Sequence, residues 1–144
     1  MIRQATKKDV TCAAEMAVMI WNSHSVEELV EEFEAALENE ECAIYLYYID
    51  NMPIGFAQCG LRHDYVEGTQ SNPVGYLEGI FIQEEYRKKG YARELLAECE
   101  NWAKEKGCSE FASDCELNNE ASFDFHMNVG FTEAGRIICF TKQI

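Results

Sequence analysis

Apolar residues recur every three or four positions in several stretches of the chain, which is the spacing of one face of an α-helix. The stretch after Ser25-Val26-Glu27-Glu28 carries a further signal, because S-x-x-E has the form of a capping box at a helix N-terminus. Gly107 and Gly130 follow two other stretches and are typical of the residue after a helix. The pattern predicts four helices, over residues 9–21, 26–37, 90–107 and 119–129.

Runs of aromatic, β-branched and other apolar residues lie between and around these helices. Cys42–Ile49 is followed by the turn signal Asp50-Asn51, so Ile54–Leu61 is expected to be its hairpin partner. Residues 62–73 are mostly polar and predict a loop. The order of elements indicates a mixed α/β sheet in one domain spanning residues 1–144. Six strands are predicted: Ile2–Ala5, Cys42–Ile49, Ile54–Leu61, Val74–Ile82, Glu110–Ser113 and Phe131–Thr141.

The composition is that of a folded and strongly acidic domain. The chain has 144 residues, 47% of them hydrophobic, which is enough to bury a core without disulfides or metal. It carries 26 acidic residues against 12 basic ones, a net charge of −14. This surface argues against nucleic acid or an anionic membrane as partner and would suit a cation. Eight glutamates lie between Glu27 and Glu41, and we interpret them as a solvated helix face.

The cysteines and histidines show no metal-binding pattern. There are seven cysteines with no C-x-x-C pair, and the three histidines are scattered, so no metal site is expected. Most of the cysteines lie in apolar patterns, as reduced thiols do in a reducing compartment. The first residues, MIRQATKKDV, lack an apolar signal region, and no apolar run is long enough to span a bilayer. These features predict a cytoplasmic protein.

The basic residues gather at one point of this acidic chain, in Arg87-Lys88-Lys89-Gly90 with Arg93 one turn later. The segment follows a predicted strand and opens a predicted helix. The first N–H groups of a helix lack partners within it, and its dipole attracts negative charge, so this is an anion site suited to a pyrophosphate. The alternative is a basic helix start without function, but cations there oppose the dipole and call for a compensating anion.

Two carboxylates occupy special positions among the strands. Glu78 interrupts an otherwise apolar strand, and Asp114 ends the neighbouring one. Buried carboxylates are costly unless they are paired or face a cleft, so these two are expected at the mouth of a cleft. There they would hold an ammonium group and accept the proton that an attacking amine must lose. The alternative is a hydrogen-bonding role at the strand ends.

At two places the chain resembles the GCN5-related N-acetyltransferases (GNAT). Arg87-Lys88-Lys89-Gly90-Tyr91-Ala92 after a strand resembles their R-x-x-G-x-A coenzyme A loop. The segment from Asn119 to Phe131 resembles their N-x-x-A-x-x-x-Y-x-x-x-G-F helix. The element order fits as well, so the resemblance covers essentially the whole chain. It implies the GNAT fold, a mixed central sheet with splayed parallel strands and flanking helices.

The resemblance also implies acetyl-CoA as the acetyl-donor cosubstrate and a homodimer as the assembly. Strand residues would offer backbone groups to the pantetheine arm, the basic turn would wrap the pyrophosphate, and an asparagine would hydrogen-bond the cosubstrate. The residues at these positions are Ile80, Phe81, Ile82, Arg87, Lys88, Lys89, Gly90, Tyr91, Ala92, Arg93 and Asn119.

Two positions depart from the family pattern. Ser122 stands where the family usually has alanine, which exchanges one small residue for another. His126 stands where many members have the tyrosine that protonates the leaving thiolate. A thiolate is a good leaving group, so His126 or water would serve in place of the tyrosine. The alternative is that His126 is a packed helix residue.

Within the family, the chain is similar to the short, single-domain aminoglycoside 6′-N-acetyltransferases. The similarity lies in Ile20-Trp21-Asn22, in residues 64–69 and 75–81, and in Phe111-Ala112-Ser113-Asp114. These relatives also place a glutamate in the turn after Gly-Phe, where this chain has Gly135 with Glu133 two residues earlier. The resemblance implies an acceptor pocket formed by Trp21, His24, Tyr65, Glu78, Asp114 and Glu133.

The chemistry expected from these residues is direct acetyl transfer. A free amine would attack the thioester carbonyl, with a backbone N–H near Phe81 stabilising the oxyanion and no covalent enzyme intermediate. A polycationic aminosugar also fits the acidic charge of the chain. Two alternatives remain: acetylation of another amine, such as a polyamine, a metabolite or a protein amino group, and a non-catalytic acyl-CoA-binding module.

Overall fold

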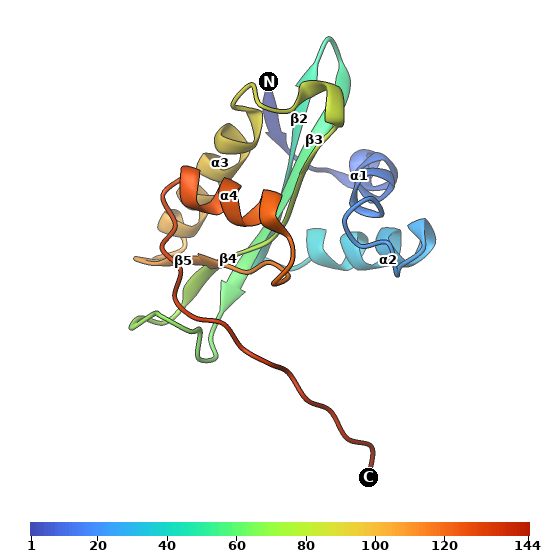
Figure 1. Ribbon diagram of the computed structural model, residues 1–144. Coiled ribbons are helices and arrows are strands. Elements are labelled where there is room, and N and C mark those ends of the chain that lie inside the picture. Colours follow the sequence, from blue (N-terminus) through green and yellow to red (C-terminus); the bar gives the residue numbers. More distant parts are fainter.

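A five-stranded sheet forms the centre of the protein (Figure 1). We describe all residues, 1–144, from a computed structural model. The strands lie in chain order, antiparallel except for the last pair, which is parallel. They are β1 (Ile2–Gln4), β2 (Cys42–Ile49), β3 (Met52–Arg62), β4 (Val74–Ile82) and β5 (Phe111–Ser113).

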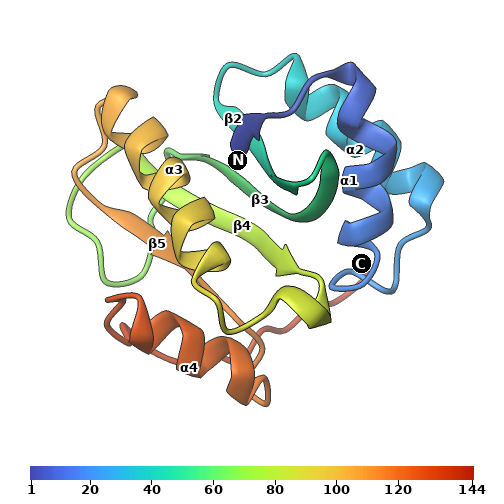
Figure 2. The ribbon, with the colours of Figure 1, turned by 90° about the horizontal axis from the view of Figure 1, so that it is seen from above.

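Helices cover both faces of this sheet (Figure 2). α1 (Val10–Ala17) and α2 (Val26–Leu37) pack on one face, over Ile44, Leu46 and Phe56. α3 (Tyr91–Glu105) packs on the other face over Ala57 and Leu77, and α4 (Glu120–Asn128) lies beside it with Phe125 and Val129 against the same core. Alternate residues of each strand point to opposite faces, which produces these two separate cores. None of the helices is long and apolar enough to cross a membrane.

The start signal predicted at Ser25 is confirmed, and a second cap is found at Asn119. The Ser25 hydroxyl accepts a hydrogen bond from the Glu28 N–H at 3.1 Å and caps α2, and the glutamates of this helix are exposed. Asn119 caps α4 in the same way, accepting from the Ser122 N–H at 3.1 Å. The first helix ends earlier than its apolar pattern predicted, at Ala17, and Trp21 lies in the following turn.

A buried carboxylate fixes the N-terminal segment to the sheet. Asp9, which is 4% exposed, accepts two hydrogen bonds from the Arg3 guanidinium, at 2.7 and 2.8 Å, and one from the Tyr48 hydroxyl at 2.8 Å. The N–H and hydroxyl of Thr6 donate to it as well, at 2.8 and 2.9 Å. Burial opposes ionisation of Asp9, but these donors outweigh it and hold its pKa far below the usual range.

β4 continues beyond the end of its parallel neighbour. Only its residues 75–77 pair with β5, opposite residues 111–113, so residues 78–82 have no strand on that side. We call residues 78–82 the open edge of β4. The Gln83 N–H donates to the Ile54 carbonyl of β3, and strand amides alternate in direction, so the N–H groups of Ile80 and Ile82 face outward. At about 3.3 Å per residue the open edge is about 16 Å long.

The prediction of a last strand over Phe131–Thr141 is wrong for the isolated chain. Residues 131–144 form no strand. Phe131 packs against the core, and the last residues of the chain run away from the body of the protein (Figure 1). Ile137, Ile138 and Phe140 are 78%, 81% and 87% exposed. The apolar pattern is present, but a strand forms only where a neighbouring strand completes its hydrogen bonds, and this chain supplies none to the segment.

Candidate active site

The basic turn lies between β4 and α3. It follows a short 3₁₀ turn, η2 (Glu84–Tyr86), and leads through Gly90 into the first residue of α3. Gly90 has φ of +90°, in the left-handed region that favours glycine. A Cβ there would meet no atom within 4 Å, so glycine is needed for the backbone turn and leaves space above the helix start.

The N-terminus of α3 has backbone N–H donors without hydrogen-bond partners and lysine side chains without ion-pair partners. No side chain caps the helix, so its first N–H groups point outward without partners. Lys88 and Lys89 are exposed and form no ion pair. Arg87 and Arg93 instead brace the turn: Arg87 donates to the Ile82 carbonyl and Arg93 to the Asn128 carbonyl, both at 2.8 Å. The arrangement suits a phosphate group, with the lysines available to neutralise it.

The two predicted carboxylates, Glu78 and Asp114, each follow the last paired residue of β4 and β5. Each is held by a hydrogen bond from a neighbouring side chain, and these two side chains contact each other. The Arg62 guanidinium donates to Glu78 at 2.9, 3.0 and 3.2 Å and stacks on the Tyr76 ring, 3.8 Å from its centroid. The Tyr76 hydroxyl donates a short hydrogen bond to Asp114. We call Arg62, Tyr76, Glu78 and Asp114 the acidic network.

The carboxylates of this network are open to solvent. The Glu78 side chain is 33% exposed and Asp114 is exposed, so neither carboxylate is buried in the core. The bidentate pair with Arg62 replaces burial as the means of holding Glu78. Burial and the hydrogen bond to Asp114 raise the pKa of Tyr76 well above its usual value, so its hydroxyl stays protonated and donates.

Trp21, predicted to line the acceptor pocket, packs against β4 and the helices on the same face. Its ring packs edge-on against Phe33 and Phe56 and covers Gly79 of β4. A Cβ on Gly79 would lie 2.5 Å from the Trp21 ring, which is closer than real contacts allow. Glycine is therefore required here for close approach. Because Gly79 follows Glu78 directly, the Trp21 ring lies next to the acidic network.

The other three residues predicted for the acceptor pocket bond to partners outside the acidic network. Tyr65 is 78% exposed and its hydroxyl donates to Glu67 at 3.3 Å, while His24 contacts Glu28 at 3.2 Å. Glu133 forms an ion pair with Arg136. None of the three predicted residues hydrogen-bonds to Glu78 or Asp114. The segment after Phe131 contacts the loop between β3 and β4, because a Cβ added at Gly135 would lie 3.6 Å from the Glu67 side chain.

His126 lies on α4 and reaches the end of β5. Its Nε2 is 2.7 Å from the Ser113 hydroxyl, and its Nδ1 is 2.6 Å from the Ser122 carbonyl. A carbonyl only accepts, so we assign the hydrogen to Nδ1, which leaves Nε2 to accept from Ser113 in the neutral ring. Sequence reasoning missed Ser113 as well as Arg62 and Tyr76, because their contacts are with residues far away in the sequence.

Asn119 has a structural task beside its predicted one. Its side-chain oxygen accepts the cap hydrogen bond of α4, and its side-chain nitrogen donates to nothing in the chain. The nitrogen therefore remains available to an acceptor on a ligand. No group of three or more His, Cys, Asp or Glu side chains is arranged to hold a metal.

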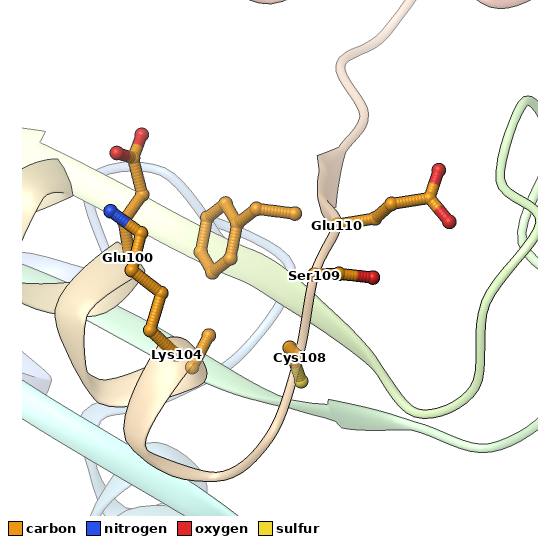
Figure 3. Close-up of a pocket in the computed structure, with 7 residues that line it drawn as sticks. Glu100, Lys104, Cys108, Ser109 and Glu110 are labelled. Atoms are coloured by element: carbon orange, nitrogen blue, oxygen red, sulfur yellow. The ribbon is translucent and has the colours of Figure 1, made fainter.

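The protein has two cavities that we compare with the predicted site residues, and only one of them is lined by any of these residues. One of about 170 Å³ lies between the end of α3 and the start of β5, lined by Glu100, Lys104 and Glu110 among others (Figure 3). Glu100 is ten residues past Gly90, about 15 Å along the helix, and no predicted site residue lines this cavity. A larger one, of about 490 Å³, lies beside α1 and includes Phe81 and Arg87.

Comparison with known proteins agrees with this geometry. The model of the acetyltransferase (GNAT) family matches residues 10–131. An aminoglycoside N(6')-acetyltransferase type 1 of Salmonella enteritidis is 35% identical over 142 residues, 99% of this chain and 98% of that protein. One of Stenotrophomonas maltophilia is 37% identical over 144 residues, 99% of this chain and 93% of that protein.

Solved structures show the same similarity. The structure of AAC(6')-Iy in complex with the bisubstrate analog CoA-S-monomethyl-acetylneamine superposes with a TM-score of 0.95 at 35% identity, covering 100% of this chain and 98% of that one. The aminoglycoside antibiotic 6'-N-acetyltransferase AAC(6')-Ih from Acinetobacter baumannii gives a TM-score of 0.94 at 34% identity, with coverage of 100% and 98%.

Proposed function

Because this chain belongs to the acetyltransferase (GNAT) family, we propose that it transfers the acetyl group of acetyl-CoA to the 6′-amino group of aminoglycoside antibiotics and so confers resistance to them. The observation that carries this proposal is the course of the open edge of β4. It leads from the basic turn, which suits a pyrophosphate, to the acidic network, which suits a cationic amine.

Acetyl-CoA would lie along this edge. The residues suited to its pyrophosphate are Lys88, Lys89 and the first N–H groups of α3. The outward-facing N–H groups of Ile80 and Ile82 would bond the pantetheine arm as a neighbouring strand would. Phe81, by the alternation of the strand, turns its N–H toward β3, so Ile80 is the better donor for the oxyanion of the transition state.

The acidic network would receive the amine. A carboxylate has about four accepting positions, of which Arg62 uses about three on Glu78 while Tyr76 uses one on Asp114. Both side chains therefore keep free positions for an ammonium, Asp114 more than Glu78. They would take the protons that the amine releases, directly or through water, as its nitrogen bonds to the thioester carbon and the carbon–sulfur bond breaks.

The remaining residues of the acceptor side would bind the aminosugar. Trp21 offers an apolar face beside Gly79, and Tyr65, His24 and Glu133 would supply polar and charged contacts. The net charge of −14 would attract a molecule with several ammonium groups, and this attraction weakens as salt is added.

We further propose that the whole chain, residues 1–144, is one catalytic domain that works as a cytoplasmic homodimer. All seven cysteines are free thiols, which fits a reducing compartment. The exposed apolar tail, residues 137–144, would pair with a second copy, where the outer edge of β5 has no neighbouring strand. Deleting residues 137–144 should then give a monomer in sedimentation velocity; a truncated chain that stays dimeric would contradict the role of the tail.

The decisive experiment measures the release of CoA thiol from acetyl-CoA with a panel of amines. The panel pairs aminoglycosides that carry a 6′-amino group with matched compounds that carry a 6′-hydroxyl group. Activity with the first set and none with the second would support the 6′ position. A preference for spermidine, another metabolite amine or a peptide would contradict the aminoglycoside assignment, and no thiol release with any amine would contradict acetyl transfer.

A further inference from the structure

Ser113 and His126 form a hydroxyl–imidazole pair where the two parallel strands part. Ser113 is the last residue of β5, and its hydroxyl lies 2.7 Å from Nε2 of His126. The other ring nitrogen is fixed by the Ser122 carbonyl at 2.6 Å, so the ring orientation is held from both sides. A hydroxyl and an imidazole joined in this way can pass a proton between them.

The pair lies on the opposite face of the sheet from the acidic network. Ser113 is paired in register with Leu77, which packs into the core beneath α3, and directly opposed residues share a face of the sheet. Tyr76 and Asp114, one position before and after, point to the face of α1 and α2. The amine would therefore approach the thioester from one face while the sulfur faces the other.

We propose that Ser113 is a catalytic residue whose hydroxyl protonates the sulfur of CoA as it leaves, and that His126 is the positioning residue that restores the proton. This inference rests on the proposed acetyl transfer. The nitrogen–carbon bond forms, the carbon–sulfur bond breaks and its electron pair goes to sulfur. His126 first takes a proton from solvent on Nε2, and the imidazolium then donates to the Ser113 oxygen. The sulfur takes the Ser113 hydrogen while the Ser113 oxygen takes the hydrogen on Nε2. The ring ends neutral and regains its proton from solvent.

The proton moves from the imidazolium toward the sulfur because of the difference between the usual pKa values of an imidazolium and a thiol. A free imidazolium is more acidic than a free alkyl thiol by about two pKa units, so transfer to a thiolate is downhill. The surroundings of the ring are mainly apolar, with the Phe125 and Phe131 rings 5.7 and 5.1 Å away between centroids. No charged side chain bonds to the ring; the charged residues on the adjoining segments are Asp114 after β5 and Glu120 and Asp124 on α4.

A purely structural role for the pair makes different predictions. Ser113 would then only hold α4 against β5, and its loss would lower stability and acetyl-CoA affinity instead of the chemical rate. Ser122 provides a matched control, because its hydroxyl lies 3.4 Å from Nδ1 while its backbone carbonyl holds the ring. Ser122→Ala should keep the carbonyl contact and wild-type kinetics.

The test compares Ser113→Ala, Ser113→Thr and Ser122→Ala in single-turnover assays with acetyl-CoA and a 6′-amino aminoglycoside. Ser113→Ala should lower the rate about 100-fold, the lower end for general acids because a thiolate leaves readily, with the Kd for acetyl-CoA unchanged. Ser113→Thr keeps a hydroxyl and should recover most of the rate.

A selenium analogue of acetyl-CoA makes the test specific to proton donation. A selenol is a stronger acid than a thiol and leaves without a proton, so the deficit of Ser113→Ala should disappear with the selenoester. If Ser113→Ala fails to fold, His126→Gln is expected to show the same loss with the thioester and the same recovery.

Three results would overturn the inference: a full rate for Ser113→Ala, an equal loss with both esters, or a loss confined to acetyl-CoA affinity. A wild-type protein inactive with every amine would instead overturn the proposed function, so the two failures are distinguishable.

Discussion

The two charged ends of the open edge of β4 are organised in different ways. At the acidic end, Arg62 holds Glu78 and Tyr76 holds Asp114, so the carboxylates have fixed positions. At the basic end, Lys88 and Lys89 have no partner of opposite charge, and the first N–H groups of α3 are uncapped. The acidic end is preorganised, whereas the basic end would take its final arrangement from the anion that binds there.

The fixed carboxylates are suited to positioning the amine, whereas the flexible lysines are suited to attracting the anionic pyrophosphate. A general base is effective when its distance and direction to the amine are set before the amine arrives. A pyrophosphate needs several donors and net positive charge, which flexible lysines supply without fixed geometry. We therefore expect substitutions at the acidic end to change rates and those at the basic end to change affinity for acetyl-CoA.

The largest expected effect is at the acidic end. Glu78→Gln and Asp114→Asn each remove a proposed acceptor for the amine proton while keeping the shape of the side chain. Each should lower kcat/KM for a 6′-amino aminoglycoside at least tenfold, and toward 100-fold where the residue is the principal base. Glu105→Gln, on the exposed end of α3, is the matched control. Full activity in both site variants would refute the proposed roles.

Asp9, a hydrogen-bonded carboxylate outside the candidate site, is expected to affect stability and not the rate. Asp9→Asn should lower the free energy of unfolding by about 2 kcal/mol, because Arg3 and Tyr48 lose a charged acceptor, and should leave kcat unchanged. Since the pKa of Asp9 is depressed in the folded protein, its stabilisation is full above the unfolded pKa, near 3.9, and is lost as the pH falls toward the folded value.

Urea denaturation at pH 7 and at pH 3 measures this contribution. The difference in stability between wild type and Asp9→Asn should shrink at the lower pH. A difference that grows on acidification would show that Asp9 is not held ionised by its donors.

At the basic end, the double substitution of Lys88 and Lys89 by alanine should raise the Kd for acetyl-CoA about tenfold, the loss of two partly exposed charge interactions. The single-turnover rate at saturating acetyl-CoA should change little. Titration calorimetry gives the Kd, and Lys104→Ala at the far end of α3 is the control. A large loss of rate with unchanged affinity would reverse the assignment of the two ends.

The smallest effect is expected for Tyr76→Phe, which removes the hydroxyl that orients Asp114 and keeps the ring under Arg62. The loss of one hydrogen bond to a charged group, about 1.5 kcal/mol, corresponds to roughly a tenfold lower kcat/KM at most. Steady-state kinetics across pH should show the change in kcat more than in KM. A larger effect on KM alone would mean that Tyr76 contacts the substrate and does not position Asp114.

Local signals in the sequence were sufficient for most of the fold. The bounds of β4 and the cap of α2 depend on residues close together in the chain, and both were predicted well. The last strand was not, because its pairing depends on a neighbouring strand. The same reason explains the missed site residues: Arg62, Tyr76 and Ser113 owe their importance to contacts 13 or more residues away in sequence.

The contact between Trp21 and Gly79 links the evolution of two distant positions. Any side chain at residue 79 would collide with the indole, and a smaller residue at 21 alone would leave a hole beside Glu78. Under selection by a new drug, each single change is harmful, whereas the pair together opens a differently shaped pocket. Adaptation through this part of the pocket therefore has to cross a fitness valley, and Gly79→Ala should be accepted only in a background where residue 21 has already become smaller.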